Sequence, residues 1–205
     1  MEKRILDCIT SFQNLIDLRY HFVLGRAGKH MSFNLTFELG DCHHLMGLHY
    51  LADRPDRRNR EKIIHELLTS EDFRRNIASS IYWDTDLINR LNCTTHLESF
   101  LDDNSTIFRY NEKRTRFYSR IKAEYLLDQV TTEQEVYLFI DKRASSDDRF
   151  CRSIFPKDDR DYAEGQARWA LLHKTKEHIS SKTTETLFQH KAYTPGEDPT
   201  AQTKV

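Results

Sequence analysis

A block of helical sequence between two groups of strand patterns is the feature that most constrains the fold. Across residues 56–102, apolar side chains recur three or four positions apart, as they do on one face of a helix. Strand patterns precede this block and resume after it at residues 106–110. The order predicts an α+β protein in which the helical block is an insertion between two groups of strands.

The segment before the insertion predicts two helices and a hairpin. An amphipathic helix is expected over residues 3–18, followed by strands at residues 20–24 and 31–38. Glycines at positions 25 and 28 give a turn signal that would join these strands in a hairpin. A short second helix is expected to begin at Asp41, its predicted N-cap, with Leu45 and Leu48 on one face.

The segment after the insertion predicts further strands. We expect strands at residues 106–110, 114–127 and 135–142. A charged loop is expected to follow them at residues 143–152. Within the third strand, residues 136–140 are apolar on both faces, which is typical of a central strand.

The end of the chain predicts less regular structure. A helical turn is expected at residues 161–167, and residues 169–174 fit either its continuation or a last strand. From about residue 180 onward the chain has few apolar side chains. We therefore expect a single domain over residues 1–178 and a flexible tail over residues 179–205.

Length and composition narrow the class of protein. A chain of 205 residues can form one good core, and 38 % apolar residues exclude a disordered chain. There is no apolar run long enough for a membrane helix and no signal-peptide pattern, and the four cysteines lack zinc-site spacing. We expect a cytoplasmic protein with reduced thiols. Because the net charge is −1, any basic surface must be local.

An alternating pattern of cations in the predicted strand at residues 114–127 indicates a binding surface. A strand would place one set of side chains on one face, namely Arg114, Arg116, Tyr118, Arg120 and Lys122. Four like charges repel one another, so this face favours an anionic partner such as the phosphates of a nucleic acid. The alternative is a solvated face balanced by nearby acidic residues, among them Glu112 and Glu124.

A cluster of histidines and one cysteine offers a second candidate. It contains Cys42, His43, His44 and His49. On one helix, His44 and His49 would lie about 140° apart, which does not suit a shared metal ion. Either the histidines pack against neighbours, or one of them transfers protons or binds phosphate. His44 is favoured for that role because it would lie in the first turn of the helix.

A third group of polar residues lies on predicted strand ends and loops, where sites are common but where solvated charges are common too. Its members are Lys142, Arg143, Arg149, Arg152, Ser153, Tyr162, Gln166, Lys174 and Lys176. No glycine-rich phosphate loop, dinucleotide fingerprint or nucleophile elbow is present. Asp84 and Asp86 form a weak signal for a metal-dependent site.

Several short motifs occur in an order that resembles a known family. They are FNLTF at 33–37, HLMGL at 44–48, IKAEYLL at 121–127, VYLFI at 136–140, SIF at 153–155, DYAEGQ at 161–166 and LLHK at 171–174. Together they resemble the fourth phage-associated group of the barnase–EndoU–colicin–RelE nuclease superfamily. The resemblance covers about residues 20–176. It departs from the family pattern at residues 151–153, where a more apolar approach to the serine is expected.

This resemblance implies a fold and an activity. It implies an N-terminal helical part, a curved antiparallel sheet, and RNA cleavage by the ribose 2′-OH without a metal or cofactor. The implied catalytic residues are His44, Arg120, Lys142, Ser153, Tyr162, Gln166 and Lys174.

The same resemblance implies a phage-associated or toxin-like ribonuclease. Its RNA substrate could be tRNA or another structured RNA, and an antitoxin or immunity protein could restrain it. Two alternatives stay open, because a protein can keep a fold after its catalytic activity has been lost. One is an inactive nucleic-acid-binding domain, and the other is a protein-interaction module that uses the helical insertion.

Overall fold

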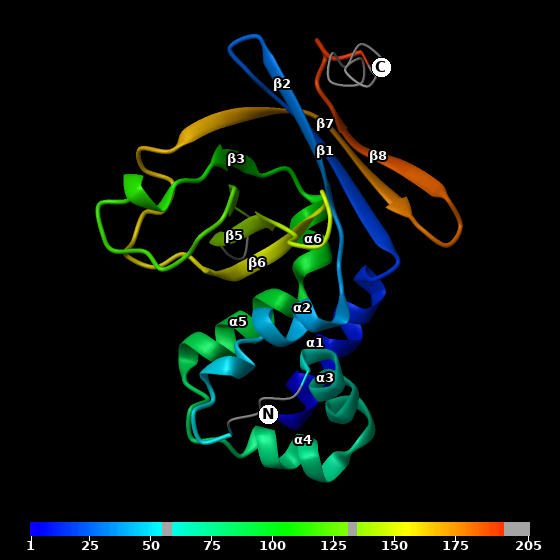
Figure 1. Cartoon of the computed structure of the whole chain (residues 1–205), viewed down its shortest axis with the longest axis vertical. Helices are drawn as coiled ribbons and strands as arrows, with labels where there is room; N and C mark the ends of the chain where they lie inside the picture. Colours follow the sequence, from blue (N-terminus) through cyan, green and yellow to red (C-terminus); the bar gives the residue numbers. More distant parts are fainter. Residues whose placement is uncertain (55–58, 131–134, 195–205) are drawn as a thin grey trace.

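The computed structural model describes residues 1–54, 59–130 and 135–194, and its helices and sheet occupy different ends of the molecule (Figure 1). Six α-helices occur in this described part: α1 (Glu2–Leu15), α2 (Leu39–Leu45), α3 (Arg60–Thr69), α4 (Glu71–Ala78), α5 (Thr85–Thr95) and α6 (Leu97–Asp102). Two 3-10 turns, η1 (Leu48–Tyr50) and η2 (Glu112–Arg114), complete the helical elements. The predicted helical insertion is thus confirmed. Within these ranges, no helix combines the length and the apolar composition that a membrane span requires.

Seven strands close into a ring, and an eighth strand extends it. The strands are β1 (Leu18–Arg26), β2 (Lys29–Leu35), β3 (Thr106–Arg109), β4 (Tyr125–Val130), β5 (Glu135–Lys142), β6 (Arg149–Pro156), β7 (Ala167–His178) and β8 (Thr183–Gln189). Their order is β1-β2-β6-β5-β4-β3-β7-β8, with β7 also paired to β1. The pairs are antiparallel except β2 with β6, which meet in parallel where Leu35 faces Arg149. The predicted curved antiparallel sheet is therefore correct in outline, but the sheet curves so far that β7 pairs with β1 and closes the ring.

Two apolar clusters hold the fold together. The larger one packs α1 and the helical insertion against one face of the sheet, and it includes Phe12, Leu24 and Ile140. The smaller one is aromatic and lies on the other face of β4 and β5. β5 contributes to both clusters, with Phe139 in one and Ile140 in the other, as expected for the predicted central strand.

The helix predicted to begin at Asp41 begins earlier and ends sooner. Glu38 is the N-cap of α2, and Asp41 is the third helical residue, whose carboxylate accepts a hydrogen bond from the Glu38 N–H at 2.9 Å. The helix ends at Leu45, and Gly47 adopts a left-handed backbone with φ of 77°. A side chain on Gly47 would meet Leu87 at 2.7 Å, so this reversal requires glycine. Leu48 therefore does not share a helix with Leu45.

The strand predicted over residues 114–127 is wrong for most of its length, because β4 begins only at Tyr125. Residues 115–124 form an extended segment without strand pairing that crosses the aromatic cluster. Phe117 and Ile121 pack on that cluster, while the even-numbered residues between them are exposed. The alternation in the sequence thus reflects one-sided packing of an extended chain and not a sheet ladder.

Three predictions for the C-terminal third also need correction. The charged loop expected at 143–152 is shorter, because β6 begins at Arg149. Residues 161–166 form bends and turns and not a helix, and Ala167 begins β7. The tail predicted from residue 179 contains β8, which pairs with β7 and packs Leu187 against the core. Threonine favours strands even where apolar residues are few, which explains the error. Residues 195–205 lie outside the described part.

Candidate functional site

The seven catalytic candidates do not form one cluster. Four of them lie around Arg90, a residue of α5 that the sequence did not single out. Ser153 accepts a hydrogen bond from Arg90. Arg120 and Tyr162 line the same cavity as Arg90. His44 is connected to Arg90 through the rings of His49 and Tyr50. Lys142, Gln166 and Lys174 have other partners and are described below.

His44 and His49 form a stacked pair. Their ring centroids are 4.4 Å apart and the rings are inclined by only 11°. The expectation that they lie about 140° apart is wrong because it assumed one continuous helix. The reversal at Gly47 ends that helix and brings His49 back over His44.

Both histidines of this pair are neutral at pH 7. Burial lowers the pKa of His44 to about 3, with help from the neighbouring His49 and Arg152. Partial burial lowers the pKa of His49 to about 4 although the residue is exposed on one side, with further contributions from His43 and Arg90. A neutral imidazole can accept a proton, so this pair has the protonation state that a general base requires.

Arg90 connects the histidine pair to the sheet. Its guanidinium lies 5.6 Å from the centroid of the Tyr50 ring and 5.1 Å from that of the Phe155 ring. It also donates a hydrogen bond of 3.1 Å to Ser153 Oγ. Tyr50 in turn contacts His49, with ring centroids 4.0 Å apart. One arginine therefore joins the helical end of the molecule to β6.

A β-bulge in β6 sets the position of Ser153. Cys151 pairs with Ile140 and Ser153 pairs with Phe139, so Arg152 is left as the extra residue of the bulge. Without the bulge, Cys151 and Ser153 would point to the same face. With it, Cys151 enters the larger core while Ser153 faces Arg90. The departure from the family pattern at residues 151–153 thus coincides with a bulge, a feature common beside active sites.

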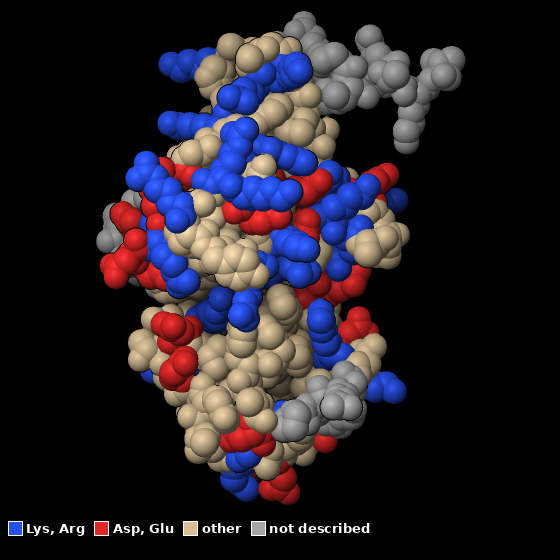
Figure 2. Space-filling model, turned by 60° about the vertical axis from the view of Figure 1, so that its left-hand side comes forward, with Lys and Arg blue, Asp and Glu red and all other residues tan. Residues whose placement is uncertain are grey.

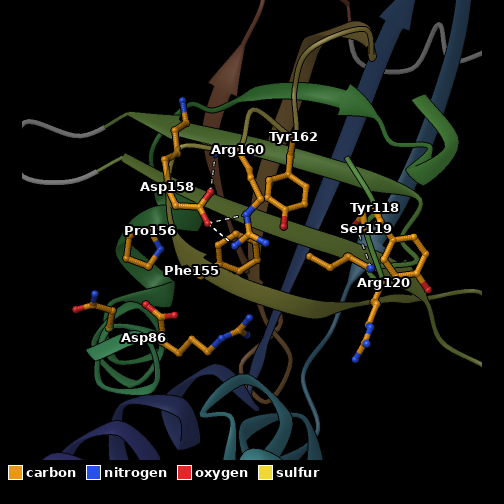
Figure 3. Close-up of a pocket in the computed structure, with 13 residues that line it drawn as sticks. Asp86, Tyr118, Ser119, Arg120, Phe155, Pro156, Asp158, Arg160 and Tyr162 are labelled. Atoms are coloured by element: carbon orange, nitrogen blue, oxygen red, sulfur yellow. Dashed lines mark hydrogen bonds and ion pairs between the residues drawn. The ribbon is translucent and has the colours of Figure 1, made fainter. Parts of the chain in front are cut away.

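A cavity of about 370 Å³ lies beside Arg90. Its walls come from α5, from the extended segment and from the end of β6 with the following loop. Figure 3 shows Tyr118 and Arg120 on one side of it and Phe155 with Pro156 on the other. Tyr162, which is 4 % exposed, belongs to the aromatic cluster behind it.

Three arginines, two that line this cavity and one at the bulge of β6, lack a carboxylate partner within the described ranges. They are Arg90, Arg120 and Arg152. By contrast, Lys157 pairs with Asp128 at 2.7 Å, and Arg160 pairs with Asp158. Lys and Arg side chains gather across the middle of this face (Figure 2). Arginines without counter-charges suit an anionic ligand, and their forked donors match phosphate.

Part of the predicted polyanion surface is already engaged by the protein. Arg116 forms an ion pair with Glu164 at 2.5 Å, and Arg114 donates to the Gly165 carbonyl at 3.5 Å. Tyr118 and Lys122 are exposed. Of the four predicted cations, Arg120 is the one that both lines the cavity and has no acidic partner among the described residues.

Lys142 and Gln166 have partners that hold loops. Lys142 is exposed at the end of β5 and forms an ion pair with Asp147 at 2.7 Å. Gln166 accepts a hydrogen bond of 2.9 Å from the Asn111 N–H and donates one of 3.1 Å to the Asn111 carbonyl. Other basic residues of the same predicted group are also engaged, Arg143 with Asp41 and Arg149 with Glu124.

Lys174 is buried in β7 and caps a helix. Its ammonium donates to the carbonyls of Leu101, Asp102 and Asp103, which end α6 or follow it. Burial lowers its pKa to about 8, so it remains charged at neutral pH. Carbonyl groups at a helix end otherwise need water or a capping residue, so this lysine has the contacts of a structural residue.

Replacing Lys174 by methionine is expected to weaken the fold without altering the chemistry of the folded protein. The change leaves three carbonyl groups without their donor, which costs about 1–3 kcal/mol of the free energy of unfolding. Thermal melting would show the loss, and activity per folded molecule would stay near wild type. A fully folded Lys174→Met protein without activity would instead indicate that Lys174 takes part in the reaction.

No group of three His, Cys, Asp or Glu side chains suited to a metal ion occurs in residues 1–54, 59–130 and 135–194. Asp84, half of the predicted DxD signal, is the N-cap of α5 and accepts the Leu87 N–H at 2.9 Å. Its carboxylate therefore has a structural partner.

A neutral histidine can accept a proton, and an arginine without a carboxylate partner can stabilise negative charge on a phosphate, so this arrangement suits an enzyme that acts on phosphodiesters. A comparison with family models matches residues 4–191 to phage-Barnase-EndoU-ColicinE5/D-RelE like nuclease4. The match covers most of the chain, so the protein belongs to this family of phage-associated nucleases, as the order of its motifs predicted. Searches of curated proteins and of solved structures gave no match.

The sequence offered one signal for Arg90. Leu87 and Leu91 form the buried stripe of α5, and Arg90 lies at the edge of that stripe. A cationic side chain in that position must either extend into solvent or find partners inside the protein, so it is a candidate for a functional contact.

Proposed function

We propose that this nuclease is a metal-independent endoribonuclease whose reaction centre lies between His44 and Arg90. The observation that carries the proposal is the neutral His44–His49 pair, joined through Tyr50 to an arginine without a carboxylate partner in the described chain. Cleavage of RNA by its own 2′-OH needs a base and a cation, and we assign these roles to His44 and Arg90.

In the proposed reaction, His44 accepts the proton of the ribose 2′-OH. The 2′-oxygen then attacks the adjacent phosphorus, the bond from phosphorus to the 5′-oxygen breaks, and a 2′,3′-cyclic phosphate forms. Water supplies the proton that the departing 5′-oxygen takes up. His49 holds the ring of His44 by stacking, and Arg90 stabilises the negative charge that builds up on the phosphate oxygens.

Arg90 is well placed for this role because its environment fixes its orientation. Two aromatic rings and the Ser153 hydroxyl hold its guanidinium. Preorganised donors stabilise a transition state more effectively than mobile ones. Ser153 is thus proposed as a positioning residue and Tyr162 as part of the cavity wall, while Arg120 and Arg152 add positive charge.

The direct test compares an RNA oligonucleotide with DNA of the same sequence in the presence of EDTA. We expect the protein to cleave the RNA, to leave a 2′,3′-cyclic phosphate, and to leave the DNA intact because it lacks the nucleophile. Cleavage that stops with EDTA and returns with magnesium or zinc would contradict the metal-independent mechanism. Cleavage of DNA at a similar rate would contradict the role of the 2′-OH.

The pH dependence of cleavage should report the low pKa of His44. A base works in its neutral form, so kcat/KM should stay flat from pH 8 down to about pH 5 and fall only near the pKa of about 3. A bound phosphate favours the charged imidazole and raises its pKa, so the fall of kcat should occur at a higher pH than that of kcat/KM. A fall of kcat/KM centred near pH 6.5 would indicate an exposed histidine instead.

A nucleic-acid-binding domain without cleavage is the second candidate. The low pKa values of both histidines in the free protein favour it, because a weak base transfers protons poorly. Salt-dependent binding of intact RNA with no cleavage at any pH would support this candidate. An antitoxin or immunity protein, and a toxin-like role in the cytoplasm, remain predictions for the active form.

A further inference from the structure

We propose that the cavity beside Arg90 binds one unpaired nucleobase of the RNA. The inference rests on the proposed function and names the kind of substrate that the site accepts, namely RNA that is single-stranded at the cleavage point. The cavity volume of about 370 Å³ falls within the range of roughly 300–1,000 Å³ that is usual for small-molecule sites.

The first reason is the state of Tyr118. Its side chain is 85 % exposed, although it borders the cavity (Figure 3). No ring contact involves Tyr118 within residues 1–54, 59–130 and 135–194, whereas Phe155 and Tyr162 are packed among other rings. An aromatic ring held open at the mouth of a basic cavity is a typical platform for a nucleobase.

The second reason is how the open ring is held in place. Phe117 precedes Tyr118 and packs edge-on against Tyr162, with ring centroids 4.8 Å apart. Ser119 follows it, accepts a hydrogen bond of 3.0 Å from the Tyr110 hydroxyl, and accepts another of 3.1 Å from the Ile121 N–H. The backbone on both sides of Tyr118 is therefore anchored, so stacking on the ring would cost little ordering entropy.

The third reason is the polar lining. Asp86 and Asn89, from one side of α5, both line the cavity, and neither side chain has a hydrogen-bond partner in the part of the chain that the structure describes. A carboxylate accepts hydrogen bonds and donates none. Uracil offers one N–H, at N3, and it lies between two carbonyl oxygens that a carboxylate repels. Asp86 should therefore favour guanine, adenine and cytosine, which carry an amino group, over uracil.

The fourth reason is continuity with the reaction centre. Arg90 lines the cavity and also contacts Tyr50, which leads to the histidine pair. A base in the cavity would therefore belong to a nucleotide next to the phosphate held by Arg90. Arg120 borders the same cavity and is free of carboxylates in the described ranges, so it suits the neighbouring phosphate.

These contacts require the base to leave its helix. A paired and stacked base cannot place its face on Tyr118 and its edge on Asp86 at the same time. The site should therefore select loops, bulges and single strands, and it should bind continuous double-stranded RNA poorly.

The experiment uses full-length protein and a 2′-O-methyl RNA oligonucleotide, which cannot be cleaved, with binding followed by fluorescence anisotropy. Wild type should bind the single strand more tightly than the same strand in a duplex. Tyr118→Ala should weaken single-strand binding by about 5- to 100-fold, whereas Tyr118→Phe should keep most of it. Tyr82→Ala, at an exposed tyrosine of the helical insertion, is the matched control and should bind as wild type does.

Replacement of Asp86 by alanine should remove the preference for amino-bearing bases over uracil in single-strand binding. Equal binding of single strand and duplex, or unchanged single-strand binding by folded Tyr118→Ala, would overturn the base site. Binding of uncleavable RNA does not depend on proton transfer. A base site with no cleavage of ordinary RNA would therefore contradict only the proposed enzyme, and cleavage without base binding would contradict only this inference.

Discussion

Replacing His44 by alanine is expected to lower RNA cleavage by about 10²–10⁴-fold while the protein stays folded. The change removes the proposed base but leaves the main packing of α2, because Cys42 and Leu45 are fully buried and His44 only partly so. The measurement pairs initial cleavage rates with a thermal melt of the same preparation. A packed histidine would instead cost stability, with activity falling only as far as folding does.

The choice of control matters for this experiment. His43 is the neighbouring histidine, but it is only 7 % exposed, so its removal is expected to disturb the core. His65 on α3 is exposed and serves as the matched control, since His65→Ala should keep both activity and melting temperature. Equal, small effects on cleavage at His44 and His65 would remove the proposed base and favour the binding-domain alternative.

Replacing Arg90 by alanine is the second change with a large expected effect, about a 10²–10³-fold loss of cleavage. The change removes the donor that is proposed to bind the phosphate, and it frees Tyr50, Phe155 and Ser153 from a shared partner. Arg90→Lys should restore only part of the rate, because an ammonium lacks the planar fork that stacks on rings and donates twice.

A second readout separates this role from a merely structural one. Arg90 lowers the pKa of both histidines, so its removal should raise the pKa of His44 and move the fall of kcat/KM to a higher pH. Arg75→Ala provides the control, since Arg75 lies exposed on α4 and pairs with acidic neighbours. An Arg90→Ala protein with normal kcat and an unmoved pH profile would exclude Arg90 from the reaction centre.

The sequence predicted those parts of the fold that depend on local periodicity. The helical insertion and the doubly buried strand β5 were both found, because each carries its pattern within a single element. The extended segment at 115–124 was misassigned as a strand because packing on one side gives the same alternation as a sheet. Pairing in a sheet depends on a neighbouring strand, which a local pattern does not identify.

The candidate site was predicted only in part for a similar reason. His44 and Arg120 were proposed from motif and pattern, but their relation depends on Arg90, one arginine of an ordinary amphipathic helix. The stacking of His44 on His49 depends on the backbone reversal at Gly47, and the direction of Ser153 depends on a one-residue bulge. Such local irregularities leave little trace in residue periodicity.

The closed ring of strands also has a consequence for how the protein is made. β1 pairs with β7, so that Leu18 lies opposite His178, and the ring cannot close until the residues of β7 have left the ribosome. Contacts this distant in sequence form slowly. Ser153 and Phe155 in β6 likewise come after the six helices of the described part and after β1–β5. A nascent chain that stops before β6 therefore lacks part of the proposed reaction centre, so the proposed cleavage of RNA could begin only after β6 and β7 have been made.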